Sequence, residues 1–430
     1  MTLISFYTLG CRLNQSETSV IERTFDNTQY QIVDFKKSAD IAIINTCTVT
    51  ENGDADTRNL VNRANRLNPN VQIALIGCQA QTQKELLTQL PNIRWVIGNA
   101  RKIDLAQIIQ ESRSKKSNSV EVITPPIPRD SFTIPVAGID RHHTRVNLKV
   151  QDGCDFFCSF CEIPYARGRA RSREFDDIIK EAKILVDAGH KEIVLTGINI
   201  ATYKYKNYNL IDIVTALECI ENLERIRISS AEPTTIPFGL IEKMAKQTKL
   251  CRYLHIPLQS GSNKILIAMK RKYTTEEFGN FIQIAYDTVP EICIGTDVIV
   301  GFPGEGDDAF NETFEFLQEL PVHYFHVFSY SKRTMAKSKN LSNELPGNTI
   351  QKRSKIIRDI SLRKKSLFHQ SLLGTTQKVL FEQFKNQYWT GLTDNYVRVN
   401  VTSSKNLTNK FLNIKIFDLD NQNNVLGKII

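Results

Sequence analysis

The hydrophobic positions of the first two thirds of the chain alternate between short apolar runs and longer stretches with a helical period. Short runs rich in Val and Ile predict buried strands, and their alternation with helical stretches predicts βαβ units with parallel sheets. We therefore expect an α/β fold. The candidate strands are Leu3–Leu9, Asp40–Asn45, Val71–Ile76, Arg145–Val150, Lys191–Leu195, Arg225–Ser229, Tyr253–Pro257, Ile292–Val300 and His323–Ser329.

The pattern changes near Thr375, where short strand-like runs are separated by Asn, Asp and Gly. Such runs, which include Gln377–Phe381, Tyr396–Val401 and Leu412–Ile416, predict a small β-barrel. A polar and proline-rich stretch before residue 140 and a basic stretch before residue 370 suggest boundaries. We predict an N-terminal domain (1–111), a linker (112–139), a central domain (140–370) and a C-terminal β domain (371–430).

Composition narrows the class of protein. Of the 430 residues, 41% are hydrophobic and 23% charged, as in globular proteins, and no apolar run approaches the roughly 20 residues of a membrane span. The start of the chain lacks the pattern of a secretory signal, so we expect a soluble, cytoplasmic protein without a membrane partner. Cytosolic thiols stay reduced, so the nine cysteines are better candidates for metal ligands or catalysts than for disulfides.

Positive charge is concentrated in one segment. Lys332–Lys365 contains eleven Lys or Arg and two acidic residues, and this excess equals the net charge of +9 of the whole chain. Such a concentration suits a polyphosphate such as RNA. A solvated helix over a domain joint is an equally good interpretation, because Ile350–Phe368 has helical apolar spacing.

Three cysteines follow predicted N-terminal strands directly: Cys11, Cys47 and Cys78. The carboxyl ends of parallel strands lie at one edge of a doubly wound sheet, so these thiols could meet there although 36 and 31 residues separate them. Three thiolates would leave one iron of a 4Fe-4S cluster open for chemistry. We call these residues the N-terminal trio; the alternative is that they are small residues in tight turns.

Three further cysteines, Cys154, Cys158 and Cys161, follow the predicted strand at Arg145–Val150 and form the central triplet. Their Cx3Cx2C spacing, with Phe160 before the third cysteine and no fourth ligand nearby, suits a cubane cluster with one free iron. That iron could chelate S-adenosylmethionine (SAM). The triplet resembles the radical SAM superfamily.

This resemblance implies a central partial (βα)6 barrel with its chemistry at the carboxyl ends of the strands. The turns that follow those strands are polar or contain glycine, and superfamily members use such turns to bind SAM. With Phe160, the implied cofactor contacts are Gly197, Asn199, Ser230, Glu232, Gln259, Gly301 and Glu305.

The whole chain resembles the methylthiotransferase family. The segments TLGCRLNQSET, NTCTVTENGDADTRN, LTGIN, RIRISSAEP, HIPLQSGSN, MKRKYT and TDVIVGFPGE are most similar to the branch, called the MtaB type, that acts on threonylcarbamoyladenosine next to the tRNA anticodon. The resemblance implies two 4Fe-4S clusters, an auxiliary cluster on the N-terminal trio and a SAM-cleaving cluster on the central triplet. It also implies two SAM molecules, a sulfur donor, a low-potential electron donor, tRNA bound through its anticodon loop, and a C-terminal domain similar to the TRAM module.

Other branches remain as alternatives. A ribosomal-protein branch usually has a histidine after the glutamine where this chain reads Gln259-Ser260, and an isopentenyladenosine branch usually has an arginine at the position of Thr50. The INIATY segment after Gly197 departs from relatives. A different class is a non-catalytic RNA-binding iron–sulfur protein.

Several residues have both a structural and a functional interpretation. Four arginines after the triplet could contact RNA or pair with acidic residues such as Glu174 and Asp176; they are Arg167, Arg169, Arg171 and Arg173. We expect structural roles for the remaining cysteines, Cys219, Cys251 and Cys293. His255 and His326 lie in barrel strands and should be satisfied core residues more often than ligands.

Overall fold

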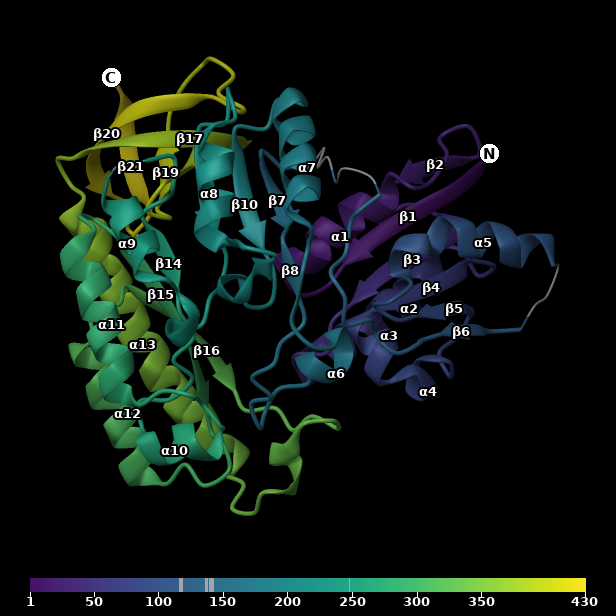
Figure 1. Ribbon diagram of the computed structural model, residues 1–430, viewed down its shortest axis with the longest axis horizontal. Helices are drawn as coiled ribbons and strands as arrows, with labels where there is room; N and C mark the ends of the chain where they lie inside the picture. Colours follow the sequence, from purple (N-terminus) through teal and green to yellow (C-terminus); the bar gives the residue numbers. More distant parts are fainter. Residues whose placement is uncertain (116–118, 136–137, 139–142, 247) are drawn as a thin grey trace.

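The computed structural model describes residues 1–430 except 116–118, 136–137, 139–142 and 247 (Figure 1). A parallel sheet at the N-terminus is followed by a partial βα barrel and a closed five-stranded C-terminal barrel. The predicted fold class is therefore confirmed. The predicted boundary between residues 139 and 140 lies outside the described residues. No helix in the described part of the chain combines the length and apolarity that a membrane crossing requires.

The N-terminal sheet has six strands in the order β2-β1-β3-β4-β5-β6, and every neighbouring pair is parallel. Its strands are β1 (Thr2–Thr8), β2 (Tyr30–Val33), β3 (Ile41–Thr46), β4 (Gln72–Gly77), β5 (Ile93–Ile97) and β6 (Glu121–Ile123). Its helices are α1 (Arg12–Glu22), α2 (Glu51–Leu67), α3 (Cys78–Thr82), α4 (Lys84–Leu87) and α5 (Leu105–Ser114). Separate apolar clusters cover the two faces, with α1 and α5 on one and α2 to α4 on the other. The sheet is thus doubly wound.

The segment predicted as a linker contributes to this sheet. Strand β6 lies within 112–139 and pairs with β5, with Trp95 opposite Glu121. A three-residue edge strand between polar and proline-rich stretches leaves little periodicity to detect, because only one face of so short a strand is covered.

The central barrel is built from six strands, all of which the hydrophobic pattern predicts within a few residues. They are β7 (Arg145–Lys149), β10 (Glu192–Thr196), β13 (Arg225–Ile228), β14 (Tyr253–His255), β15 (Cys293–Val300) and β16 (Tyr324–Ser329). Neighbouring strands are parallel, in the orders β7-β10-β13 and β14-β15-β16, and a bridge between Ile226 and Leu250 joins the two groups. The barrel stays open between β7 and β16.

Helices cover the outside of the barrel (Figure 1). They are α7 (Phe175–Asp187), α8 (Leu210–Glu218), α9 (Phe238–Ala245), α11 (Thr275–Thr288), α12 (Asp307–Glu319) and α13 (Gly347–Ser371). Shorter elements in the connections are β8 (Gln151–Asp152), α6 (Ile163–Arg167), β9 (Arg171–Ser172), β11 (Lys204–Tyr205), β12 (Tyr208–Asn209) and α10 (Asn263–Ala268). Alternate strand residues such as Leu254 and Ile256 pack in the core with these helices. The intervening positions therefore face the barrel interior.

The C-terminal strands close in the order β17-β18-β19-β21-β20. They are β17 (Thr376–Lys385), β18 (Tyr388–Thr393), β19 (Arg398–Val401), β20 (Phe411–Leu419) and β21 (Val425–Ile429). This domain closes the amino-terminal end of the central barrel: Arg225 donates to the carbonyl of Leu392 (3.0 Å), and Arg227 donates to that of Thr393 (3.0 Å). The chemistry expected at the carboxyl ends of the central strands therefore lies at the opposite end.

Candidate active site between two cysteine trios

The three cysteines of the N-terminal trio meet at one edge of the sheet. Cys11 is the N-cap of α1, Cys47 follows β3, and Cys78 is the first residue of α3. A Cβ on Gly10, whose φ is +89°, would lie 2.9 Å from the Cys47 Sγ, so glycine is required for this close approach. Burial raises the pKa of the Cys47 thiol to about 12, and the negative charges of Cys78 and Cys11 act in the same direction.

The central triplet occupies the loop between β8 and α6. Backbone N–H groups of this loop donate to the Sγ atoms of Cys154 (3.5 Å) and Cys161 (3.4 Å), and Arg271 Nη1 donates to the Sγ of Cys158 (3.2 Å). Burial raises the pKa of Cys161, and the charges of Cys158 and Cys154 raise it further. These thiols therefore need a compensating positive charge to ionise together, which iron would supply.

The spacing of both sets suits a cluster better than a single ion. Within the described residues, the only group of three His, Cys, Asp or Glu ligand atoms that all lie within 4.8 Å of one another contains no cysteine. A tetrahedral zinc ion would draw its thiolates closer than this, whereas cluster ligands bind separate irons. Neither cysteine set is therefore arranged around a single tetrahedral ion, and both stay candidates for the predicted 4Fe-4S clusters.

The two cysteine sets lie at one interface, between the N-terminal sheet and the central barrel, and a buried hydrogen bond joins the residues that follow Cys47 and Cys161. Thr48, which follows Cys47, donates its Oγ1 to the Oε2 of Glu162 (2.7 Å), which follows Cys161. Asn99 Nδ2 also donates to the Sγ of Cys78 (3.5 Å) and to the carbonyl of Ala166 in α6 (2.7 Å). The N-terminal sheet and the central barrel therefore hold their cysteines in one fixed arrangement. The sequence did not predict Glu162 as a site residue, although its position directly after Cys161 could have indicated it.

A buried ion network fixes the same interface. Glu17 of α1 accepts bonds from Lys149 Nζ of the barrel (2.7 Å) and from both terminal nitrogens of Arg167 in α6 (3.0 Å each). Its second oxygen also pairs with Lys102, and Asp152 completes the network by pairing with Lys149 and Arg167. Burial alone would raise the pKa of Glu17, but the three cations together hold it well below its usual range.

Two of the predicted cofactor contacts are connected to the central triplet. Asn199 and Cys154 both line a cavity of about 330 Å³. Asn199 Oδ1 accepts from the backbone N–H of Glu232 (3.3 Å), whose carboxylate pairs with Arg271, the donor to Cys158. Asn199 Nδ2 is buried and has no hydrogen-bond partner among the described residues, so it is a donor left for a ligand such as SAM. Arg271 lies in the MKRKYT segment but was not predicted individually.

The other predicted contacts have less direct connections. Gly197 packs under Gln151, whose Oε1 would lie 2.9 Å from a Cβ there. Glu305 accepts from the backbone N–H of Gly301 and lies 3.8 Å from Arg353, so it supports its own turn. The remaining three, which stay predictions together with these, are Phe160, partly buried beside an apolar cluster, half-buried Ser230, and buried Gln259.

For two of the four arginines, the structure supports the structural interpretation rather than contact with RNA. Arg167 and Arg173 are fully buried, and Arg173 pairs with Asp177 (2.6 Å) and Glu181 rather than with the expected Glu174 or Asp176. The remaining two are Arg171, which pairs with Asp152, and the exposed Arg169, which pairs with Asp155. Spacing in the sequence could not reveal partners that lie on other elements.

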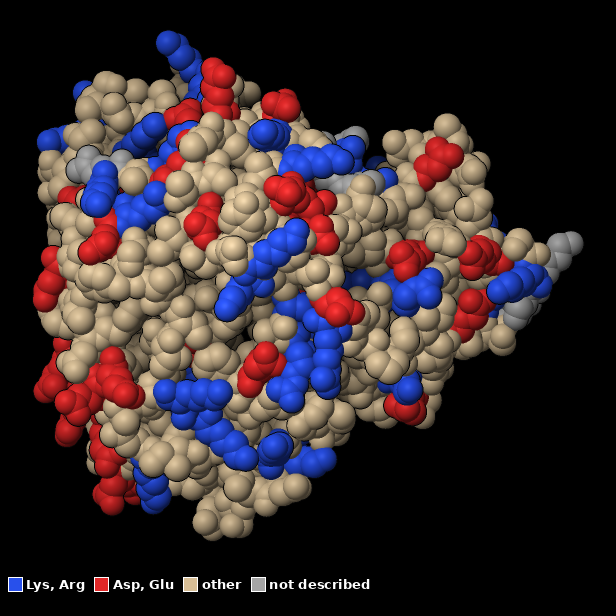
Figure 2. Space-filling view, in the orientation of Figure 1, with Lys and Arg blue, Asp and Glu red and all other residues tan. Residues whose placement is uncertain are grey.

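The basic segment also divides into structural and exposed charges. Arg333 pairs with Asp54 (2.8 Å) and Glu162 (3.3 Å), and Arg353 pairs with Asp307 (2.6 Å), so these two stabilise the fold. The exposed cations without a carboxylate partner among the described residues are Lys337, Lys339, Lys352, Lys355, Arg358, Arg363 and Lys365. Figure 2 shows Lys and Arg gathered across the middle and lower part of one face, with Asp and Glu over α12.

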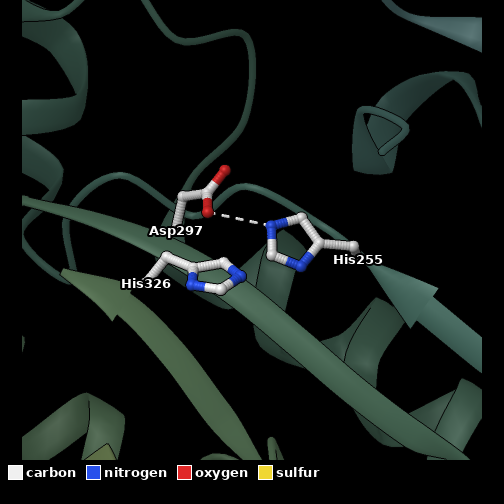
Figure 3. Close-up of side chains that lie close together, drawn as sticks. All are labelled: His255, Asp297 and His326. Atoms are coloured by element: carbon white, nitrogen blue, oxygen red, sulfur yellow. Dashed lines mark hydrogen bonds and ion pairs between the residues drawn. The ribbon is translucent and has the colours of Figure 1, made fainter. Parts of the chain in front are cut away.

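The two barrel histidines belong to one polar group, shown in Figure 3. His255 Nε2 lies 2.8 Å from the Oδ1 of Asp297, and its Nδ1 lies 3.3 Å from the hydroxyl of Tyr324. The ring of His326 lies 5.2 Å from that of His255. His255 is therefore buried and satisfied, as expected. His326 is exposed, so the expectation of a satisfied core residue is wrong for it.

The remaining cysteines differ in their surroundings. Cys251 and Cys293 are buried in the apolar contact between the central barrel and the C-terminal domain, as expected. Cys219 is exposed at the C-cap of α8, so it does not have the buried position that the expected structural role implies. Its position in the helical pattern did not distinguish the last, solvent-facing turn from the interior.

Comparisons with known proteins agree with this geometry. Residues 4–98 match the Uncharacterized protein family UPF0004, and residues 148–317 match the Radical SAM superfamily. The solved structure of the radical SAM methyltransferase TsrM from Kitasatospora setae has a TM-score of 0.56 and 13% identity, and covers 76% of this chain and 75% of that one. This likeness supports the fold alone. The superfamily implies a 4Fe-4S cluster and SAM.

Curated relatives match nearly the whole chain. Threonylcarbamoyladenosine tRNA methylthiotransferase MtaB of Bacillus subtilis is 37% identical over 97% of this chain and 94% of its own length. MtaB of Aquifex aeolicus is 36% identical over 92% of this chain and 96% of its own length. A tRNA-2-methylthio-N(6)-dimethylallyladenosine synthase of Buchnera aphidicola is 31% identical over 97% of each chain. The chain therefore belongs to the MtaB-type methylthiotransferase family of radical SAM enzymes.

Proposed function

We propose that this enzyme methylthiolates carbon 2 of N6-threonylcarbamoyladenosine (t6A) at position 37 of tRNA, giving ms2t6A. Two relatives that are named for this nucleoside, at 37% and 36% identity, support the proposal. A relative named for the dimethylallyl nucleoside is 31% identical and makes that substrate the alternative.

The observation that carries the proposal is the pair of cysteine sets at the interface between the N-terminal sheet and the central barrel. A carbon that receives sulfur from one site and is activated at another must lie within reach of both. The Thr48–Glu162 hydrogen bond and the Glu17 network hold the two sites together. The N-terminal trio would hold the auxiliary cluster, and the central triplet would hold the cluster that cleaves SAM.

Replacement of an unactivated aromatic C–H bond lies beyond side-chain acids and bases at neutral pH. Two 4Fe-4S clusters and two molecules of SAM, when bound, supply the methylated sulfur and the radical that this replacement requires. The protein contributes position and environment. Asn199 and Glu232 are the polar groups available to orient SAM beside the central triplet, and Arg271 supplies a positive charge next to Cys158.

The proposal also requires partners. Exposed cations on α13 are available for the phosphates of the anticodon loop, and proteins reach a loop base most readily in its unstacked form. A low-potential electron donor would reduce the central cluster, and an unidentified donor would renew the transferred sulfur. A tRNA substrate favours a cytoplasmic location.

Mass spectrometry of nucleosides from tRNA tests the proposal in cells with and without the gene. Loss of ms2t6A with accumulation of t6A would support it. Restoration by the wild-type gene and by Cys219→Ala, but not by Cys47→Ala, would tie the product to the N-terminal trio, because Cys219 is a thiol outside both sets.

Other outcomes would refute part or all of the proposal. Loss of the isopentenyl analogue alone would refute the t6A substrate and support the alternative nucleoside. If neither nucleoside changed, a tRNA substrate would be refuted, and ribosomal proteins would be analysed for a methylthiolated aspartate. Failure of the reduced protein to release 5′-deoxyadenosine from SAM would refute radical catalysis and leave an RNA-binding role.

A further inference from the structure

A hollow of about 370 Å³ lies between the central barrel and the C-terminal domain. Tyr324 and His326 of β16 line it from the barrel, Lys365 from α13, and Tyr396 from the turn between β18 and β19. We call it the floor hollow, because the C-terminal domain closes this end of the barrel. Its size is in the range of pockets that bind small organic groups.

Arg12 extends from the N-terminal domain to the edge of this hollow. It directly follows Cys11, and its Nη2 donates to the hydroxyl of Tyr396 at 3.0 Å. It is half-buried, and no carboxylate lies within ion-pair distance of it in the part of the chain that the structure describes. This separates Arg12 from the buried arginines of the same interface, such as Arg167 and Arg333, which each pair with two carboxylates.

Polar groups on the opposite wall are also left without partners. His326 is exposed, and neither of its ring nitrogens has a hydrogen-bond partner among the described residues, although Asp297 and His255 lie beside it (Figure 3). Tyr396 has a φ of +65°, which is unfavourable for a bulky residue, and its ring stacks on that of Tyr253 with centroids 4.3 Å apart. Strain of this kind persists where a side chain is needed in one position.

The charges around the hollow favour an anion. His255, Asp297 and His326 have ligand atoms within 4.8 Å of one another, which would also suit a divalent metal. Burial and His255 lower the pKa of His326, Asp297 raises it, and Lys365 and Arg12 lower it, so both cations act on this group against the carboxylate of Asp297, which is itself bonded to His255. A bound divalent metal would add to the positive charge here, whereas a bound carboxylate would reduce it.

An anion in this place could be a carboxylate or an RNA phosphate. Arg12 directly follows Cys11, and its guanidinium contacts Tyr396. Its side chain therefore connects the N-terminal trio with the floor hollow. A backbone phosphate would have to enter this partly enclosed space with its ribose. A carboxylate on the N6 substituent would extend from the reacting base toward Arg12 while C2 faces the cysteine sets, since C2 and N6 lie on the same edge of adenine on either side of N1.

We propose that Arg12 binds the carboxylate of the threonylcarbamoyl group, with Tyr396 and His326 as the polar walls of its subsite. This inference rests on the proposed function and names the residue that selects an anionic substituent over an apolar one such as isopentenyl. A charge-assisted pair that is partly shielded from water should contribute about tenfold or more to affinity.

The test compares binding of two versions of one tRNA to the full-length, cluster-loaded protein, one carrying t6A37 and one unmodified A37. We expect wild-type protein to prefer the t6A form and Arg12→Gln to lose at least about tenfold in affinity for it, with no change for the A37 form. Arg12→Lys should keep part of the preference. Arg23→Gln, at the exposed end of the same helix, should behave like wild type. Tyr396→Phe should give a smaller, t6A-specific loss.

Three results would overturn the assignment. Equal weakening of both RNAs by Arg12→Gln would indicate a phosphate contact, and an unchanged preference would remove Arg12 from the subsite while leaving the proposed function intact. If wild-type protein did not distinguish the two RNAs, the t6A substrate and the subsite would fail together. Iron counting on each variant keeps cluster loss from being mistaken for loss of the contact.

Discussion

The network around Glu17 makes a strong prediction about stability. The carboxylate is 2% exposed and contacts three cations: Lys102 of its own domain, and Lys149 and Arg167 of the central domain, whose side chains are at most 6% exposed. Glu17→Gln keeps the size of the side chain and removes its charge. Lys149 and Arg167 would then keep Asp152 as a buried counter-charge, whereas Lys102 would keep none among these residues.

We expect Glu17→Gln to lower the free energy of unfolding by about 3–5 kcal/mol, because removal of one partner leaves uncompensated charge in a place that water cannot reach. The pH dependence has a defined sign. The folded-state pKa of Glu17 lies well below its unfolded value, so its stabilising effect is present above about pH 4.3 and is lost as the pH falls through the folded pKa. Glu17→Gln should therefore flatten the acid limb of the stability curve.

Urea unfolding followed by circular dichroism measures the change, with iron content as a second readout of the interface. Asp104→Asn is the matched control, since the Arg101–Asp104 pair lies on either side of Lys102 but is about half exposed. That variant should lose less than about 1 kcal/mol. If Glu17→Gln cost no more than Asp104→Asn, the network would not carry the charge balance of the interface and the reasoning would be refuted.

Three further predictions concern the clusters, RNA and one buried acid. Cys47→Ala should abolish methylthiolation and lower iron content while SAM cleavage stays detectable; product formed by a variant without the auxiliary cluster would contradict the assignment. Lys352→Glu with Lys355→Glu should weaken tRNA binding and reduce its salt slope by about 2, as expected for two exposed phosphate contacts; an unchanged slope would remove these lysines from the RNA interface. Burial raises the pKa of Glu305 to about 7, so its stabilising effect should fall as the pH rises from about 4.5 to 7.5, by ~3 kcal/mol at most. Glu305→Gln should remove this slope in unfolding experiments on the cofactor-free protein, and an equal slope in the variant would contradict the origin of the effect.

The sequence predicts the elements of the site well because its periodicity is a local property. Strands β3 and β4 have continuous apolar runs; Cys47 and Cys78 come directly after them, and Cys11 lies three residues after the end of β1. Since parallel strands end at one edge, the convergence of these thiols follows from topology alone. The hydrophobic pattern likewise predicted the six strands of the central barrel.

Pairing between distant residues could not be predicted in this way. Glu17 and Arg167 are 150 residues apart, and nothing in the spacing of four arginines indicates that one of them crosses to another domain. The buried Arg333 illustrates the same limit, because the net charge of its segment suggested RNA while its own partners are Asp54 and Glu162. The charge composition of a segment predicts its surface charge only when the residues in buried ion pairs are left out of the count.

Leaving out the residues in buried ion pairs also shows why Arg12 is informative. The interface between the N-terminal sheet and the barrel neutralises its buried cations with carboxylates, as Glu17, Asp152 and Glu162 do for their neighbours. Arg12 lies at the same interface, and among the described residues only the neutral hydroxyl of Tyr396 accepts a hydrogen bond from it. A partly buried cation without a counter-charge is costly for the free protein. Binding of an anionic substituent would relieve that cost and link substrate selection to the assembly of the two cysteine sets.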